Sequence, residues 1–242
     1  MLETRAAVDQ NELARSAIER SRLYGLLATV FRHEPSVEFL RQMKTPELVA
    51  ALANSGIDLG YTFEAANAAH LVDDLAIEYT RLFLGPGRHI SPHESVQLKR
   101  GSGMLWGPET PVVRQAYRDA GFEIGESETK IPDHISVELD FLSLLTTDEA
   151  AAWEADDQGR LVEILKFQHS FIARHLGKWV SAFCTKVRGE AELPFYAAFA
   201  EILQGYLSGE KAEIVHRQSL LGVTVEPESE EQHDHPLRSI NE

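Results

Sequence analysis

Residues 71–87 read LVDDLAIEYTRLFLGPG, and this stretch decides the fold class. Its apolar side chains recur at the spacing of one helix face: Leu71, Leu75, Tyr79, Leu82 and Phe83. Gly85-Pro86-Gly87 then ends the helix, because proline donates no backbone hydrogen bond and glycine is costly inside a helix. We expect this helix to begin at Thr62. No strand precedes the glycines and no Gly-Lys-Ser/Thr follows them, so the turn does not resemble a phosphate-binding loop.

Helical periodicity extends along the rest of the chain. Asn11 is expected to cap a first helix that runs to about Phe31. Further helices are expected over residues 46–56, 110–121, 132–145, 160–186 and 194–207, and Gly177 could divide the helix over 160–186. No alternating pattern predicts a strand. The sequence therefore predicts an all-α fold, a single globular helical bundle of about ten helices.

The ends and the middle of the chain differ from this pattern. Residues 1–10 are expected to form an N-terminal extension, residues 11–225 the helical domain, and residues 226–242 an acidic, disordered tail with few apolar side chains. Residues 88–107 are repeatedly broken by proline and glycine, and so long a broken segment in a compact chain is more often functional than idle. It could also hinge two lobes, or allow two copies to form a domain-swapped homodimer.

Charge and composition exclude several classes of partner. The net charge of −15 repels a phosphate backbone, so nucleic acid is disfavoured, whereas a basic peptide would be attracted. Solubility alone also explains an acidic surface. No apolar run is long enough to cross a bilayer, and no secretory signal begins the chain, so we expect a cytoplasmic protein without membrane insertion. The single cysteine, Cys184, excludes an intramolecular disulfide.

Three segments in this order carry a family resemblance. They are Glu78-Tyr79-Thr80-Arg81-Leu82-Phe83-Leu84-Gly85-Pro86-Gly87, Pro92-His93-Glu94-Ser95-Val96, and Pro132-Asp133-His134-Ile135 continuing into Glu138-Leu139-Asp140-Phe141-Leu142. Weaker echoes follow at His175-Leu176 with Trp179 and at Phe195-Tyr196. Together they resemble the TorD/DmsD/NarJ family of redox-enzyme maturation chaperones, over about residues 23–207. Signal-peptide-binding relatives often carry an aromatic residue just after the loop proline or a few residues later, where this chain has His93 and Gln97.

The resemblance implies a helical chaperone that is not an enzyme and holds no cofactor or metal. Members bind the signal peptide or N-terminal region of a molybdenum-cofactor oxidoreductase subunit. They aid cofactor insertion and delay twin-arginine export until the client is ready. The alternative is a NarJ-like assembly chaperone for a molybdoenzyme subunit that is not exported.

The candidate binding residues are those that match the family's motifs or lie beside broken backbone: Leu84, Gly85, Pro86, Glu94, Trp106, Pro132, Asp133 and His134. Asp133 and Glu94 are expected to pair with client arginines, because carboxylates accept bidentate guanidinium hydrogen bonds. Local pattern alone instead favours Asp133 as an ordinary first-turn acid of the helix after Pro132. Trp106 could anchor a partner or plug its loop onto the core. Glu138, one turn after His134, could meet that histidine.

Catalytic readings have less support. His89 and His93 with Glu94 have a ligand-like spacing, but Pro92 and Gly87 disfavour a helix there. His233, Asp234 and His235 lie in the expected tail. No nucleotide-binding motif is present. Cys184 lies in an apolar helix, which is typical of an inert thiol.

Overall fold

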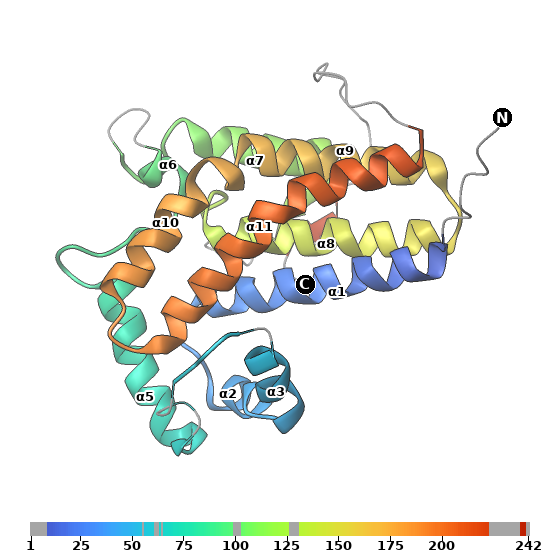
Figure 1. Cartoon of the computed structure of the whole chain (residues 1–242). Coiled ribbons are helices and arrows are strands. Elements are labelled where there is room, and N and C mark those ends of the chain that lie inside the picture. The colour runs from blue at the N-terminus through green and yellow to red at the C-terminus, as the bar shows by residue number, and fades with distance from the viewer. Residues whose placement is uncertain are drawn as a thin grey trace.

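The computed structural model describes residues 9–54, 56–60, 63, 65–98, 103–125, 131–222 and 238–240. Their helices are α1 (Gln10–Arg32), α2 (Val37–Met43), α3 (Pro46–Asn54), α5 (Ala68–Tyr79), the π-helix η1 (Thr80–Leu84), α6 (Glu94–Gln97), α7 (Glu109–Asp119), α8 (Ile135–Glu154), α9 (Gln158–Arg174), α10 (Leu176–Glu190) and α11 (Pro194–Leu220). Figure 1 shows a helical bundle, which confirms the predicted all-α class. In the part of the chain described, no helix has the length and apolar character that crossing a membrane requires.

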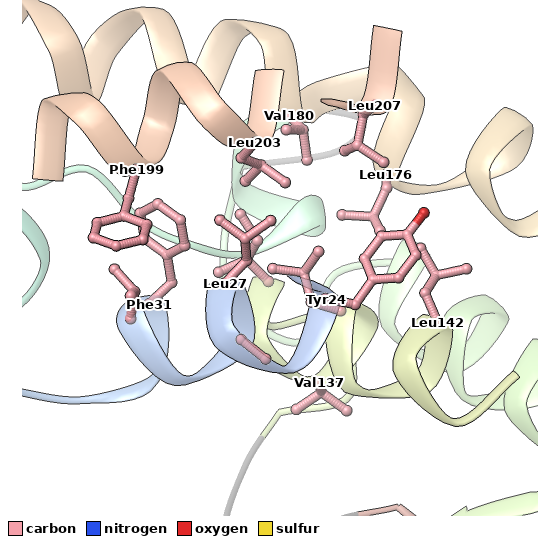
Figure 2. Packing of buried hydrophobic residues seen from close by; sticks show 14 of the residues in the cluster. Tyr24, Leu27, Phe31, Val137, Leu142, Leu176, Val180, Phe199, Leu203 and Leu207 are labelled. Carbon is pink, nitrogen blue, oxygen red and sulfur yellow. The ribbon is translucent and has the colours of Figure 1, made fainter. Parts of the chain in front are cut away.

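Helices α1 and α8 form the long spine of the bundle and run antiparallel (Figure 1). Near one end Gln10 donates to Asp156, and near the other Arg32 pairs with Asp140. Helices α9, α10 and α11 cover this pair. Figure 2 shows Leu27 and Phe31 of α1 directed toward Phe199 of α11. The buried apolar side chains form one cluster that draws on helices from α1 to α11.

Capping side chains explain where the helices begin. The carboxylate of Asp9 accepts from the backbone N–H groups of Asn11 and Glu12, so Asp9 caps α1 and the prediction of Asn11 was wrong. Asn67 caps α5 in the same way. Thr62, the predicted start of that helix, lies outside the described residues. Helix α5 passes directly into η1, and the helical stretch ends at Leu84 before Gly85, as predicted.

The break between α9 and α10 falls at His175, two residues before the predicted Gly177. Gly177 nevertheless matters at this junction, because the space beside its Cα is too small for a side chain. A Cβ at Gly177 would lie 2.5 Å from the backbone oxygen of Ile172. Beyond this junction, α11 runs thirteen residues past its predicted end at Leu207, to Leu220.

Two three-residue strands were not predicted. β1 (Phe122–Ile124) pairs in parallel with β2 (Arg238–Ile240). Three residues are too few to show an alternating pattern, which explains the omission. Residues 223–237 lie outside the description, but Ile240 is fully buried. The predicted disordered tail over 226–242 is therefore wrong for residues 238–240, because one apolar side chain and a strand edge hold them.

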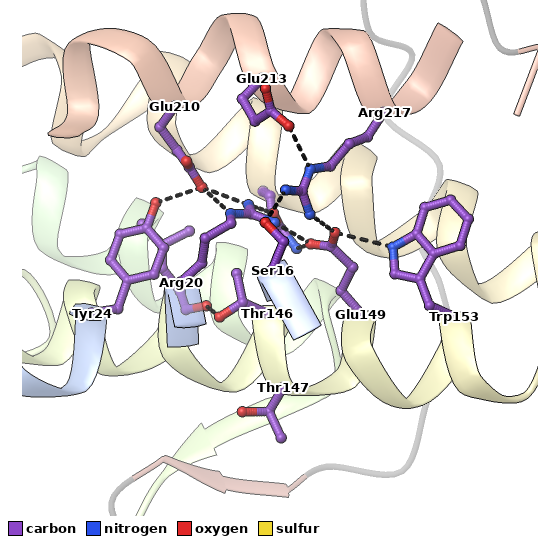
Figure 3. A network of polar contacts seen from close by, with 12 residues as sticks. Ser16, Arg20, Tyr24, Thr146, Thr147, Glu149, Trp153, Glu210, Glu213 and Arg217 are labelled. Atoms are coloured by element: carbon purple, nitrogen blue, oxygen red, sulfur yellow. Dashed lines mark hydrogen bonds and ion pairs between the residues drawn. The ribbon is translucent and has the colours of Figure 1, made fainter. Parts of the chain in front are cut away.

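A buried polar network ties α1, α8, α9 and α11 together (Figure 3). Glu149 accepts from Arg20 at 2.6 Å, Arg217 at 2.7 Å, Gln168 at 2.8 Å and the indole of Trp153 at 3.2 Å. Arg20 also pairs with Glu210 at 2.5 Å. Burial alone would raise the pKa of Glu149, but Arg20 and Arg217 together lower it. The network is therefore charged and internally satisfied.

Candidate functional site

The second and third motif segments, forty residues apart in sequence, are joined by a short antiparallel bridge. The N–H of Glu94 donates to the carbonyl of Asp133 at 3.0 Å, and the N–H of Ile135 donates to the carbonyl of Pro92 at 2.8 Å. Between these bonds His93 pairs with His134, and their rings meet edge to face at 4.8 Å. We call this pairing the 93–134 bridge. It brings Glu94, Asp133 and His134 together, as the resemblance implies for one site.

Asp133 is fully buried and its carboxylate is already occupied. One oxygen accepts from the backbone N–H of Ser95 at 2.8 Å and the other from the hydroxyl of Thr110 at 2.9 Å. These bonds tie α6 and α7 to the segment before α8. Asp133 therefore does not present a free carboxylate to solvent, and an arginine of a partner would have to displace these donors.

The start of α8 also differs from the prediction. The helix begins at Ile135 rather than at Pro132, and His134 is its cap, with Nδ1 accepting from the N–H of Ser136 at 3.1 Å. Asp133 is therefore not a first-turn acid. Pro132 is buried, and its carbonyl accepts from the hydroxyl of Tyr117 at 2.8 Å. His134, by contrast, is half-buried.

Glu94 forms a buried pair that the sequence did not reveal. Its carboxylate lies 3.0 Å from Nδ1 of His175, at the junction of α9 and α10. Both side chains are nearly inaccessible. His175 appeared in the sequence only as a weak echo of the family pattern, because nothing local marks a histidine that closes a contact eighty-one residues away.

Glu138 lies beneath the 93–134 bridge with neither oxygen hydrogen-bonded to a described group. Burial first, then the nearby acids Glu94 and Asp133, raise the pKa of Glu138 well above its ordinary value. The indole N–H of Trp179 favours the ionised form but does not reach hydrogen-bond geometry. Glu138 forms no hydrogen bond with His134, whose Nδ1 accepts from the backbone N–H of Ser136.

The pKa of His93 is lowered by burial, against the opposing attraction of Asp133. Neutral imidazole is therefore favoured next to the bridge. The phenol of Tyr117 is also buried, and burial followed by the charges of Glu138 and Asp133 raises its pKa. The buried acids Asp133 and Glu138 and the phenol of Tyr117 therefore share one interior beside the bridge.

The exposed large apolar side chains in the described part of the chain all lie between residues 77 and 112: Ile77, Leu84, Met104, Leu105, Trp106 and Val112. Ile77 lies on α5, at the lower left of Figure 1, and Leu84 lies at the end of η1. Val112 lies on α7, at the top of Figure 1, and the other three lie in the loop before α7. Trp106 is 65% exposed and has a φ of 61°. It therefore does not plug its loop onto the core, and its backbone adopts a conformation that is uncommon for a bulky residue. Gly85 is half-buried and Pro86 exposed.

The catalytic readings find no geometry among the described residues. No group of three His, Cys, Asp or Glu side chains there could hold a metal ion. His89 is exposed, and His233 to His235 lie outside the description. Cys184 is buried, and burial raises the pKa of its thiol to about 12, so it is a weak nucleophile at neutral pH.

Comparisons with known proteins agree with the motif reading. The family model described as nitrate reductase delta subunit matches residues 38–185, which include the 93–134 bridge. The chaperone protein TorD of Vibrio parahaemolyticus is 25% identical over 79% of this chain and 96% of its own. The Tat proofreading chaperone DmsD of Salmonella paratyphi A is 29% identical over 78% of this chain and 88% of its own. Both relatives are named as chaperones, in agreement with the expectation of a non-enzyme.

A solved structure, described as a proposed redox enzyme maturation protein from Archaeoglobus fulgidus, is 20% identical. It covers 86% of this chain and 98% of its own, with a TM-score of 0.47. A similarity of this strength supports no argument about the site.

Proposed function

Because the chain belongs to the nitrate reductase delta subunit family, we propose that it is a dedicated chaperone for a molybdenum-cofactor oxidoreductase subunit. It binds the signal peptide or N-terminal region of that client and keeps it unexported while the cofactor is inserted. The proposal extends to this chain what the names of the TorD and DmsD relatives say of those proteins.

The observation that carries the proposal is the gathering of exposed apolar side chains within residues 77–112. Single apolar residues scattered on a surface need no explanation, but these all fall within one stretch of the sequence, and in our proposal this stretch contacts the client. We call Leu84, Met104, Leu105, Trp106 and Val112 the apolar surface set. A signal peptide has a basic start followed by an apolar stretch. The net charge of −15 would attract the basic start, and the apolar surface set would contact the apolar stretch.

We assign different roles to the candidate residues according to their exposure. Leu84, Pro86 and Trp106 are accessible and would make the first apolar contacts, with Gly85 setting the turn. His134 is half-buried and would contact the client at the bridge. Glu94, Pro132 and Asp133 are buried and would meet client arginines only after the 93–134 bridge opens.

A non-exported client is the second candidate function, because the family description names a nitrate reductase subunit and does not mention export. The Tat proofreading name of the DmsD relatives favours the export branch. The two differ in what the client carries, a twin-arginine signal or a plain N-terminal segment.

Deletion of the gene tests the proposal in the cell. A molybdoenzyme subunit encoded beside it should then accumulate with less molybdenum, measured by mass spectrometry of the purified subunit. A gene copy carrying Trp106→Ala and Leu84→Ala should restore less molybdenum than the wild-type gene, whereas a copy with the exposed control Asp74→Asn should restore all of it. Full molybdenum loading in the deletion strain would reject the proposal.

A further inference from the structure

Glu138 is a buried acid that the internal hydrogen bonding of the site leaves out. It lies in the first turn of α8, and its backbone N–H donates to the carbonyl of His134 at 3.1 Å. Its side chain is fully inaccessible, and neither carboxyl oxygen has a hydrogen-bond partner among the described groups. A buried carboxylate without partners is costly, so this group is neutral unless water reaches it.

Among the described residues, the groups that face Glu138 come from several elements, and none of them forms an ion pair or a hydrogen bond with its carboxyl group. Glu94 of α6 and the preceding acid Asp133 are repulsive. Tyr117 of α7 donates its hydroxyl to Pro132 instead. Trp179 of α10 is the one donor directed toward it.

The histidine that pairs with Glu94 is also bound away from Glu138. His175 lies against Glu94, at 3.0 Å from its carboxylate. The imidazole of His175 is therefore bonded to Glu94 and not to Glu138. The burial and the two acids agree with the raised pKa of Glu138.

Access to the site requires the bridge to open. Glu94, Pro132 and Asp133 are buried, and two backbone hydrogen bonds close the bridge over them. Opening breaks the bond from Glu94 N–H to Asp133 and the bond from Ile135 N–H to Pro92. Glu138 is fully inaccessible in the closed protein, and its backbone N–H is bonded to His134 of the bridge.

We propose that opening of the 93–134 bridge releases the proton held by Glu138, and that client binding at this site is coupled to the release of that proton. The second half of this statement rests on the proposed function, and the first half does not. In the closed state Glu138 binds one proton that the open state has lost at neutral pH. Opening therefore becomes more favourable as the pH rises, by up to about tenfold per pH unit.

Amide hydrogen exchange tests the first half without any client. The amides of Glu94 and Ile135 report bridge opening directly, and an amide in the middle of α11, such as Leu203, serves as the control. Between about pH 5.5 and pH 8.5, protection factors of the two bridge amides should fall by up to about tenfold per pH unit in the wild type.

The matched variant is Glu138→Gln, which keeps the shape of the protonated acid and cannot ionise. Its bridge amides should show protection that changes much less with pH. Every other titratable group near the bridge is the same in both proteins, so the difference between the two isolates Glu138. The same pH dependence in wild type and variant would overturn the proposal.

Calorimetric titration with a twin-arginine signal peptide tests the second half, in two buffers of different ionisation enthalpy. The wild type should release a proton on binding and Glu138→Gln should not. Binding without proton release, or equal release by both proteins, would overturn the coupling while leaving the proposed function intact. Absence of binding by both proteins would count against the proposed function and the coupling together, and the exchange experiment would still decide the first half.

Discussion

Replacement of Glu149 by alanine is expected to be one of the most destabilising single changes in this protein. Glu149 accepts four hydrogen bonds from buried donors, two of them from the guanidinium groups of Arg20 and Arg217 (Figure 3). Both arginine side chains are almost inaccessible, at 7% and 2% exposure. Removing their shared carboxylate leaves two buried cations with fewer partners.

The magnitude follows from those partners. Removing one member of a buried ion pair ordinarily costs about 3–5 kcal/mol of unfolding free energy. Arg20 retains Glu210, and Arg217 retains Glu213 and Ser16, so neither charge is left bare. We therefore expect a loss of about 4 kcal/mol, which lowers the melting temperature by about 8 °C in a chain of this length.

Glu213→Ala provides the matched control. Its carboxylate also pairs with Arg217, at 3.1 Å, but its side chain is 47% exposed. Solvent screens such a pair, so the expected loss is below about 1 kcal/mol. Thermal and urea unfolding followed by circular dichroism measure both variants. Equal losses in the two variants would refute the argument that burial sets the cost.

The same variant has a defined pH dependence. The folded state lowers the pKa of Glu149 below its ordinary value of 4.5 despite burial, because Arg20 and Arg217 favour the carboxylate. This stabilisation is fully present above that value and is lost as the pH falls through the lowered pKa. The stability gap between wild type and Glu149→Ala should therefore narrow in acid. A gap that stays constant on acidification would contradict this electrostatic account.

Three further predictions concern the junctions and the surface. Gly177→Ala should lower the unfolding free energy by about 1–3 kcal/mol, because the new Cβ would lie 2.5 Å from a backbone oxygen. Gly189→Ala in the same helix is the control, because its Cβ would meet nothing within 4 Å, and it should stabilise the protein by about 0.5–1 kcal/mol. Urea titration of both variants decides this, and a Gly177→Ala protein as stable as wild type would show that the junction relaxes freely. Ile240→Ala should cost about 2–4 kcal/mol in the same assay, since the side chain is fully buried, and no loss would show that β2 does not contribute to the folded core. Trp106→Ala should change the unfolding free energy by less than about 0.5 kcal/mol but weaken binding of a signal peptide, measured by calorimetry, at least about tenfold. Unchanged affinity would show that Trp106 is not part of the binding surface.

The all-α class followed from sequence because helical spacing is a local property repeated over many residues. The stop after Leu84 was predicted for the same reason, since proline and glycine act on the backbone where they stand. The strands β1 and β2 were not predictable, because each is three residues long and its partner is more than a hundred residues away. Asp9 was missed as a cap because Asn11, two residues on, is an equally good capping type.

The sequence motifs indicated which residues belong to the candidate site, but not how deeply each is buried or which groups it contacts. The sequence brought Glu94, Asp133 and His134 into one hypothesis, and the structure joins the segments that carry them. The burial of Asp133 could not be foreseen, because its partners Ser95 and Thr110 come from two other helices. Long-range pairing of this kind leaves no periodic signal in the sequence.

The buried polar groups were hardest to anticipate. Arg20 and Glu149 lie on the inward faces of α1 and α8, where sequence patterns predict apolar side chains. A buried charge is recognised only when its partners are known, and those partners come from four different helices.

The central claim is that this chain binds the N-terminal region of a molybdoenzyme client, and calorimetric titration tests it most directly. The ligand is the N-terminal peptide of a molybdoenzyme subunit encoded beside this gene, and a scrambled peptide of equal charge is the control. We predict a dissociation constant of about 1 μM or tighter for the native peptide, equivalent to about −8 kcal/mol, and at least tenfold weaker binding of the scrambled one. Equal affinity for the two peptides, or no binding of either, would contradict the claim.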